Sequence, residues 1–185
     1  MCVCMRSRMC LWVFWIIMAV VTGCYCALSL LTFSNTFKAY DVSPNSESES
    51  IRAILAAAFF GSVMVFLYLF VSFCTLLGKT IFRSGAGFTY GFITSSSIHM
   101  AMMCLLCGLV LIGFKEDVVS KFEDDPKKLG TEWGKIDTQA YKATFSMAFV
   151  STLMYLIFFG ILVFDKGAVQ KNDADVAKIE ASSKA

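Results

Sequence analysis

The stretch that decides the fold runs from Ile54 to Phe114 and holds two long apolar runs separated by a short basic turn. The first run reads LAAAFFGSVMVFLYLFVSFCTLL, the turn reads GKTIFRSGAG, and the second run reads FTYGFITSSSIHMAMMCLLCGLVLIGF. Neither run carries a charged residue, and each exceeds the about 20 apolar residues with which a helix crosses a bilayer. The turn, which contains Lys79 and Arg83, is too short to form a domain. The stretch therefore predicts a transmembrane helical hairpin.

Two further apolar runs flank this hairpin. The four predicted spans cover residues 11–33, 53–77, 88–114 and 143–164. The composition agrees with this interpretation, because 57% of the residues are hydrophobic and the mean hydropathy is +0.68, whereas soluble domains are about 45–50% apolar. Backbone polar groups inside lipid must be paired within the protein, which requires helices here. We therefore expect an all-α integral membrane protein with four transmembrane helices in one antiparallel bundle.

The polar segments define the ends of the chain and its orientation. They are a basic, cysteine-containing head (1–10), which precedes the membrane domain (11–164), and a charged tail (165–185). Four spans place both termini on one side of the membrane. Basic residues divide evenly between the two sides, but Arg6 and Arg8 directly precede the first span, which usually dominates orientation. We expect cytosolic termini and a multi-pass protein of the plasma membrane or endomembranes, with an organellar membrane left open.

The segment 115–142 is the longest polar loop of the predicted membrane domain. It mixes acidic and basic residues, and Pro126 interrupts it. A short helix on either side of this break is expected, with Val118, Val119 and Phe122 on one face. A loop of mixed charge suits polar contact with a partner surface. The net charge of only +2 gives no indication of nucleic-acid binding.

Small residues recur at four-residue spacing in the second and third spans. Ala57 and Gly61 form one pair, and Gly87 and Gly91 form the other. Such pairs allow helix backbones to approach closely, which matters in lipid because the expulsion of water cannot drive helix association there. The pairs predict either packing within the four-helix bundle or a face for self-association.

Polar residues inside the third span form one candidate patch, consisting of Ser95, Ser96, Ser97 and His99. An ionisable residue inside a membrane is a functional hypothesis by default. The predicted spans contain no acidic partner for His99. The patch therefore predicts either interhelical hydrogen bonds that stabilise the bundle or a role in transport or sensing.

Two groups of cysteines are candidates for chemistry. Cys104 and Cys107 lie on one face of the third span, and four-helix membrane oxidoreductases that reduce quinones use such a pair. Those enzymes also need a second cysteine pair in an exposed loop, which this chain does not have. Cys2, Cys4 and Cys10 lie beside the basic residues that precede the first span, a typical position for S-palmitoylation. Unmodified thiols are the alternative for these three residues.

The sequence does not contain the residues that haem binding, zinc binding, nucleotide binding or serine hydrolase activity would need. A single histidine cannot supply bis-histidine haem ligation, and no Cys/His cluster has the spacing of a zinc site. The sequence also contains neither a P-loop nor a G-x-S-x-G motif. We therefore expect no metal, no cofactor and no enzymatic activity.

The layout resembles that of four-span MARVEL-type proteins, which have cytosolic termini, a short first loop, a tight second loop and a longer third loop. A second similarity involves the segment from Cys74 to Lys79, CTLLGK, which is similar to the Cys-x-Thr-Leu-Trp-Gly signature of the amastins. In amastins the signature belongs to a loop after the first span, and Leu77 replaces its Trp here. Neither resemblance carries a functional residue over to this chain.

These observations predict a non-enzymatic protein that organises membrane or serves as an accessory subunit. Its partners would be the lipid bilayer and either other membrane proteins or further copies of itself, bound through helix packing and the charged 115–142 loop. The alternative is a small oligomeric channel or transporter with the Ser95–His99 patch along its path. A third hypothesis is a membrane dithiol oxidoreductase that uses Cys104 and Cys107.

Overall fold

Five helices make up the described part of the chain. The structure is a computed structural model, and it describes residues 8–41, 46–76, 86–124 and 132–164. The helices are α1 (Arg8–Asp41), α2 (Ser46–Leu76), α3 (Ala86–Gly113), α4 (Lys115–Asp124) and α5 (Glu132–Phe164). No strand occurs within these ranges.

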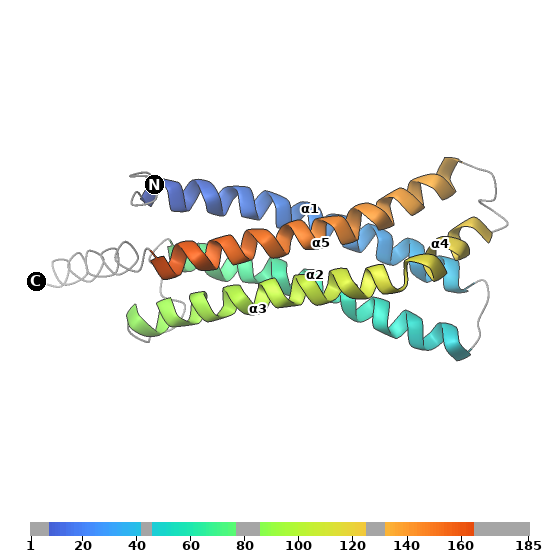
Figure 1. The fold of residues 1–185 in the computed structure, drawn as a ribbon, viewed down its shortest axis with the longest axis horizontal. Helices are drawn as coiled ribbons and strands as arrows, with labels where there is room; N and C mark the ends of the chain where they lie inside the picture. Colours follow the sequence, from blue (N-terminus) through green and yellow to red (C-terminus); the bar gives the residue numbers. More distant parts are fainter. Residues whose placement is uncertain (1–7, 42–45, 77–85, 125–131, 165–185) are drawn as a thin grey trace, which may run out of the picture.

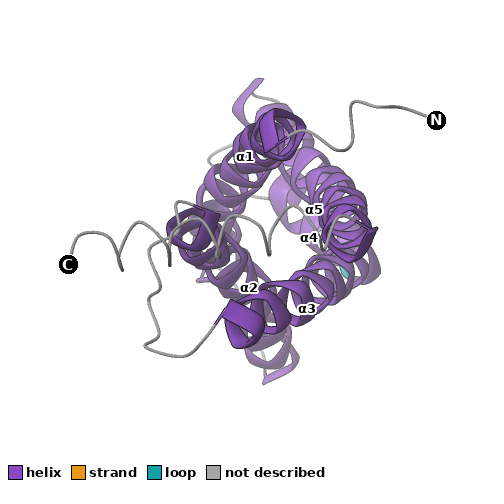
Figure 2. Ribbon diagram, turned by 90° about the vertical axis from the view of Figure 1, so that its left-hand side faces the viewer, coloured by secondary structure: helices purple, strands orange, loops and turns teal. Residues whose placement is uncertain are grey.

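The four long helices form an antiparallel bundle, as the sequence predicts (Figure 1). Viewed from the end where α1 begins, they surround a common axis (Figure 2). Each long helix packs against two neighbours: α1 and α3 each lie against α2 and α5, and the most extensive pair is α3 with α5. The order around the bundle is therefore α1, α2, α3, α5, and helices that are adjacent around the ring run in opposite directions.

All four long helices are apolar enough to cross a membrane. The candidate spans are Trp12–Lys38, Glu49–Cys74, Gly91–Gly113 and Asp137–Phe164, with mean hydropathies between 2.0 and 2.5. Their outer surfaces are apolar as well, since Val20 is 61% exposed and Phe70 is 66% exposed. A water-facing surface would not carry so many large apolar side chains, whereas lipid accepts them. The chain is therefore a multi-pass membrane protein with a four-helix bundle as its membrane domain.

The helices extend beyond the apolar runs that predict the spans. Within the segment 115–142, assigned above to a loop, Lys115–Asp124 forms α4 and the residues from Glu132 onwards belong to α5. Of the two short helices expected here, the one before Pro126 is present as α4, whereas the residues from Glu132 onwards are the first turns of the long helix α5 and not a separate short helix. Val118 is fully buried against the bundle, and Val119 is half-buried. The side chain of Phe122 lies outside the described part.

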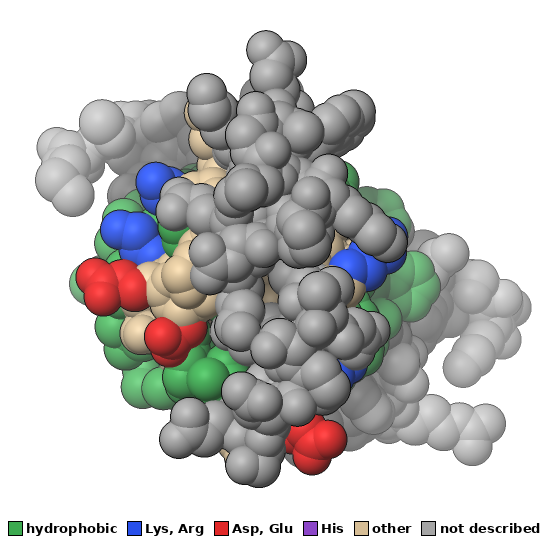
Figure 3. All heavy atoms as spheres, turned by 90° about the vertical axis from the view of Figure 1, so that its right-hand side faces the viewer, with side chains coloured by type: hydrophobic (Ala, Val, Ile, Leu, Met, Phe, Trp, Pro, Cys, Tyr) green, Lys and Arg blue, Asp and Glu red, His purple; other side chains and the backbone are tan. Residues whose placement is uncertain are grey.

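Charged side chains gather at the end of the bundle where α1 ends and α5 begins (Figure 3). The described members are Lys38, Glu49, Arg52, Lys115, Glu116, Asp117 and Lys142. One of them, Arg52, lies over the ring of Phe37 with its guanidinium carbon 4.7 Å from the ring centroid. These charged residues therefore lie outside the candidate spans or within a few residues of the span ends, where charged side chains can reach the membrane surface.

Candidate functional site

A row of hydroxyl groups lies inside the bundle rather than on its surface. On α1 the buried side chains that carry a hydroxyl group are Thr22, Tyr25, Ser29, Thr32 and Thr36, and each is at most 1% exposed. They recur every three or four residues, which is the spacing of one helix face. Since the outward faces are apolar, this polar face of α1 has to be directed at the other helices.

In the half of the bundle where α1 begins, two groups of hydrogen bonds connect the helices. Thr22 Oγ1 donates to Tyr155 Oη at 3.4 Å, and Tyr155 Oη donates to the Val65 carbonyl oxygen at 3.3 Å. The hydroxyl oxygens of Tyr68 and Ser97 lie 2.6 Å apart. These bonds join α1, α2 and α5 in the first group and α2 and α3 in the second, where lipid offers no alternative partners.

A similar arrangement joins α1 and α5 in the other half. The hydroxyl oxygens of Thr32 and Thr144 are 3.2 Å apart, and Asn35 Nδ2 donates to Asp137 Oδ1 at 2.8 Å. Tyr141 Oη donates to a backbone carbonyl of α3 at 2.7 Å. Asp137 is only 6% exposed, so the bundle holds a buried carboxyl group at the start of the last span. The sequence analysis did not identify this carboxyl group, because the predicted span begins at residue 143, after Asp137.

Several buried hydroxyl groups have no hydrogen bond to any residue that the structure describes. Tyr25 Oη, Ser29 Oγ and Ser151 Oγ are of this kind and lie in the middle of the spans, and Thr36 Oγ1 and Thr94 Oγ1 are the others. Tyr25 lies beside Ser29 and the two cysteines of α3, but not in hydrogen-bonding geometry with them. Leaving such a group unpaired costs about 1–3 kcal/mol. The middle of the bundle is therefore its least satisfied polar region.

The two candidate redox cysteines lie in this middle region. Cys104 is fully buried, Cys107 is 5% exposed, and both are free thiols. Cys107 packs against the backbone of α2, because a Cβ atom added to Gly61 would lie 2.7 Å from Cys107 Sγ. The dithiol oxidoreductase stays a prediction, and a quinone-dependent activity that is lost on Cys104→Ser is the observation it requires.

The structure divides the predicted polar patch between two faces of α3. Ser97 points into the bundle towards Tyr68, and Ser96 is half-buried. Ser95 and His99 are exposed on the outside, with His99 Nδ1 2.7 Å from the backbone oxygen of Ser95. Successive helical residues point about 100° apart, since there are 3.6 residues in a turn, so neighbours in sequence cannot share one face.

The small residues are divided in the same way. Gly61 is buried against α3, whereas Ala57 is exposed on α2. Gly91 is exposed on α3, and a Cβ atom there would meet nothing within 4 Å. Gly87 belongs to α3, but its surroundings lie outside the described part. Of the four predicted packing residues, Gly61 is therefore the one that the structure places at a contact between helices.

A close contact that the sequence analysis missed occurs between α3 and α5. A Cβ atom added to Gly108 would lie 3.2 Å from Phe149 Cζ and 3.4 Å from Ala148 Cβ. Gly108 follows Cys104 by four residues, and this small-xxx-small spacing is the signal that could have identified it. The close approach agrees with the extensive packing between α3 and α5.

The remaining candidates concern modification and metal binding. Cys2 and Cys4 lie outside the described residues, and Cys10 lies in the first turn of α1. Their S-palmitoylation stays a prediction. Within the described part of the chain, no three His, Cys, Asp or Glu side chains lie close enough together to hold a metal ion.

The chain has no match among known protein families, and no curated protein and no solved structure is significantly similar to it. The resemblances to MARVEL-type proteins and to amastins accordingly stay predictions. The geometry of the described residues is the basis on which a function can be assigned.

Proposed function

We propose that the protein is a non-enzymatic, membrane-organising or accessory-subunit protein that binds other transmembrane helices through the outer face of α3. The observation that supports this most is the position of His99. It points away from the bundle, and its second ring nitrogen makes no hydrogen bond to the part of the chain that the structure describes. A single chain in lipid would expose this polar ring to hydrocarbon.

The depth of His99 in the membrane makes that exposure costly. His99 follows the first residue of the span Gly91–Gly113 by eight positions, which is about 12 Å along the helix axis. The hydrocarbon core is about 30 Å thick, so the ring lies within it. Ionisable residues at such depth face other protein or water rather than lipid. A partner helix on this face would supply the missing cover and a hydrogen-bonding group.

The residues around His99 also fit a helix partner. Gly91, Ser95 and His99 are four residues apart and form one exposed stripe along α3. Because a Cβ atom at Gly91 would meet nothing within 4 Å, the backbone there is open to close approach from outside. Small residues bring helices together and Ser and His hydrogen-bond across them, which is how transmembrane helices associate in lipid.

Native mass determination after extraction in mild detergent tests this proposal. The unmodified protein should run with discrete partner chains or as a homo-oligomer, and Gly91→Leu and His99→Leu should each release the single chain. Gly160→Leu is the matched control, because a Cβ atom at Gly160 on α5 also meets nothing within 4 Å. A single chain in all three variants, or the assembly of the unmodified protein in all three, would contradict the proposed face.

A second candidate function, the passage of a small polar solute or ion, is favoured by the hydroxyl groups inside the bundle. His99 faces outward and so could line a path only between chains. The inward row on α1, together with the buried Asp137, instead favours a path within one chain. Flux into liposomes should then fall for Asp137→Asn with the assembly intact, and not for Lys142→Gln, whose side chain is exposed. Equal flux in both variants, or none in the unmodified protein, would exclude this function.

A further inference from the structure

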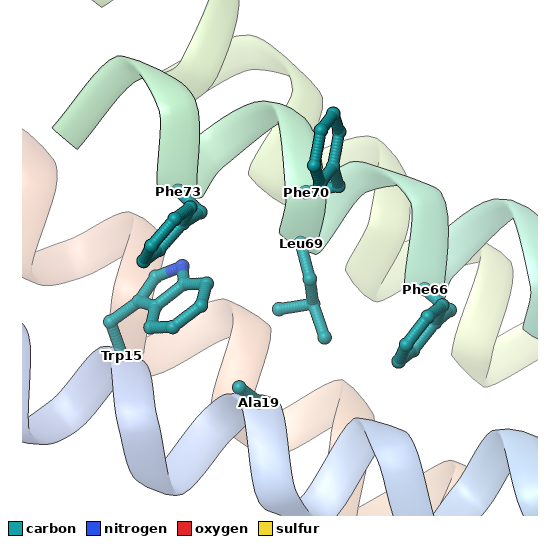
Figure 4. A pocket seen from close by; sticks show the side chains of 6 residues that line it. All are labelled: Trp15, Ala19, Phe66, Leu69, Phe70 and Phe73. Carbon is teal, nitrogen blue, oxygen red and sulfur yellow. The ribbon is translucent and has the colours of Figure 1, made fainter. Parts of the chain in front are cut away.

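An apolar groove of about 270 Å³ lies on the outside of the bundle between α1 and α2. Figure 4 shows the side chains that line it: Trp15, Ala19, Phe66, Leu69, Phe70 and Phe73. Three of them, Phe66, Phe70 and Phe73, are exposed at the outer surface. The groove therefore opens towards lipid and not into the interior of the bundle.

The wall on the α1 side is fixed in place. Trp15 Nε1 donates to Ser72 Oγ at 2.9 Å, which anchors the indole ring to α2. The ring centroids of Trp15 and Phe73 are 5.2 Å apart, and Trp12 contacts Phe73 edge-on at 5.9 Å. Below this aromatic cluster Ala19 provides the only small side chain in the lining. A rigid aromatic wall beside a small residue makes a preformed site for an apolar chain.

The groove begins near the membrane surface and runs inward. Trp15 lies three residues into the span that starts at Trp12, which is about 4.5 Å along the axis. On α2 the lining extends from Phe73 to Phe66, which is about 10 Å of helix. A site that enters the hydrocarbon from the interface matches the course of a lipid acyl chain.

The sequence that precedes α1 and the sequence that joins α2 to α3 carry basic residues and no acidic ones. The sequence has no acidic residue before Asp41 and none between Ser50 and Glu116. Arg6 and Arg8 precede, by a few residues, the span that starts at Trp12, so the sequence places basic residues where α1 enters the membrane. A basic residue at the membrane surface attracts anionic lipid by about 1 kcal/mol.

We propose that this groove binds an acyl chain of an anionic phospholipid whose headgroup lies at the basic start of α1. The groove supplies the apolar contact, and the absence of acidic residues from the neighbouring sequence favours a negative headgroup over a neutral one. The site is separate from the outer face of α3, so it does not depend on the function proposed above.

Lipid retention measured on the full chain tests the site. The protein is purified in mild detergent from vesicles of equal phosphatidylglycerol and phosphatidylcholine, and bound lipid is identified by native mass spectrometry. Ala19→Phe fills the groove and should abolish the retained phosphatidylglycerol. Ala27→Phe is the matched control, because Ala27 is exposed on the same helix but does not line the groove. The control should retain the lipid as the unmodified protein does.

A second variant tests the contribution of charge to the binding of the headgroup. Arg8→Gln should weaken phosphatidylglycerol retention roughly fivefold, the change for loss of about 1 kcal/mol. Lys38→Gln, at the other end of α1, should leave retention unchanged. Equal retention of the neutral lipid by the unmodified protein would overturn the proposal, as would retention by Ala19→Phe. A sterol bound in place of phospholipid, when the vesicles contain cholesterol, would also overturn it.

Discussion

At Gly61 the interior of the bundle leaves no space for a side chain. An added Cβ atom would lie 2.7 Å from Cys107 Sγ, so either the Cys107 side chain or one of the two helices has to shift. We expect Gly61→Ala to lower the free energy of unfolding by about 1–2 kcal/mol, as overpacking does. In a Cys107→Ala background the sulfur is gone and the same change should cost much less. Unfolding of the protein in detergent micelles, followed by circular dichroism, measures both.

The control for this comparison is Gly160→Ala, because a Cβ atom added to Gly160 would meet nothing within 4 Å. It should leave the free energy of unfolding nearly unchanged in detergent. If Gly61→Ala lowers the free energy of unfolding equally with and without Cys107, the destabilisation arises elsewhere, such as in the backbone of α2. That result would contradict the contact between Gly61 and Cys107.

Two buried tyrosines should respond differently to the loss of a hydroxyl group. Tyr68 Oη bonds Ser97 and donates to the Ile93 carbonyl oxygen at 3.0 Å, so Tyr68→Phe should cost about 0.5–1 kcal/mol. Tyr25 Oη makes no hydrogen bond to a described residue, so Tyr25→Phe should be neutral or stabilising. The same unfolding measurement applies. A clear loss of stability for Tyr25→Phe would mean that its hydroxyl group is satisfied within the folded protein.

The sequence could not predict which of these side chains point inward. The spans are apolar on nearly every face, so no change of hydrophobicity around the helix reveals which side is buried. Ser95 to His99 therefore read as one patch, although Ser97 is buried and His99 is exposed. In lipid the useful signal is the face that carries small and polar residues, and on α1 it runs from Thr22 to Thr36.

Among the elements, α4 is the one whose position depends on few contacts. It packs mainly against α1 and α5, and among its side chains that the structure describes (residues 115–120) Val118 is the fully buried apolar one, in a cluster with Leu111 and Tyr141. We expect Val118→Asp to release α4 from the bundle, because burial of a valine contributes about 1.5–3 kcal/mol and a buried unpaired carboxylate is costly. Hydrogen exchange should then become faster in Lys115–Asp124 while the long helices stay protected.

Ser120→Asp is the comparison for this variant, because Ser120 is exposed on the same helix. It should leave the exchange of α4 unchanged. Faster exchange in both variants would mean that any added acid disturbs the helix, and unchanged exchange in Val118→Asp would contradict the docking of α4 through Val118.

Sequence reasoning succeeded in giving the number and direction of the long helices but not their ends. Apolar runs mark the lipid-embedded part of a helix, and nothing requires the helix to stop at the membrane surface. On α1 the helix continues past Phe33 to Asp41, and α5 begins at Glu132, where Asn35 and Asp137 bond the two helices together. These polar contacts between distant parts of the chain are invisible to a count of hydropathy along the sequence.

For the molecule as a whole, the polar and apolar residues are arranged as a lipid environment requires. Large apolar side chains such as Val20, Phe70 and Leu153 face outward, while hydroxyl groups face the other helices. Because lipid is as apolar as leucine, burying such side chains would not stabilise the bundle, and hydrogen bonds and close packing have to hold it together. This agrees with the positions of Gly61 and Gly108, which among the described glycines are the two where an added Cβ atom would meet a neighbouring helix within 4 Å.

The bundle also makes a prediction about the two sides of the membrane. The start of α1 and the end of α5 lie at the same end of the bundle, and α4 lies at the opposite end (Figure 1). Since Arg6 and Arg8 precede the first span, that first end should face the cytosol. Glycosylation sites introduced on each side test this in cells, because the acceptor is Asn-x-Ser/Thr and only lumenal sites are modified.

Two single substitutions create these sites. Leu129→Asn makes Asn-Gly-Thr between α4 and α5, and Ala174→Thr makes Asn-Asp-Thr in the tail. We expect a glycosidase-sensitive increase in mass for Leu129→Asn alone, because the loop between α4 and α5 faces the lumen when the termini are cytosolic. An increase for Ala174→Thr alone would reverse the orientation, and the charge of the head would then not determine it. An increase for both would contradict the even number of spans, because residues 129 and 174 flank α5 and one membrane crossing must separate them.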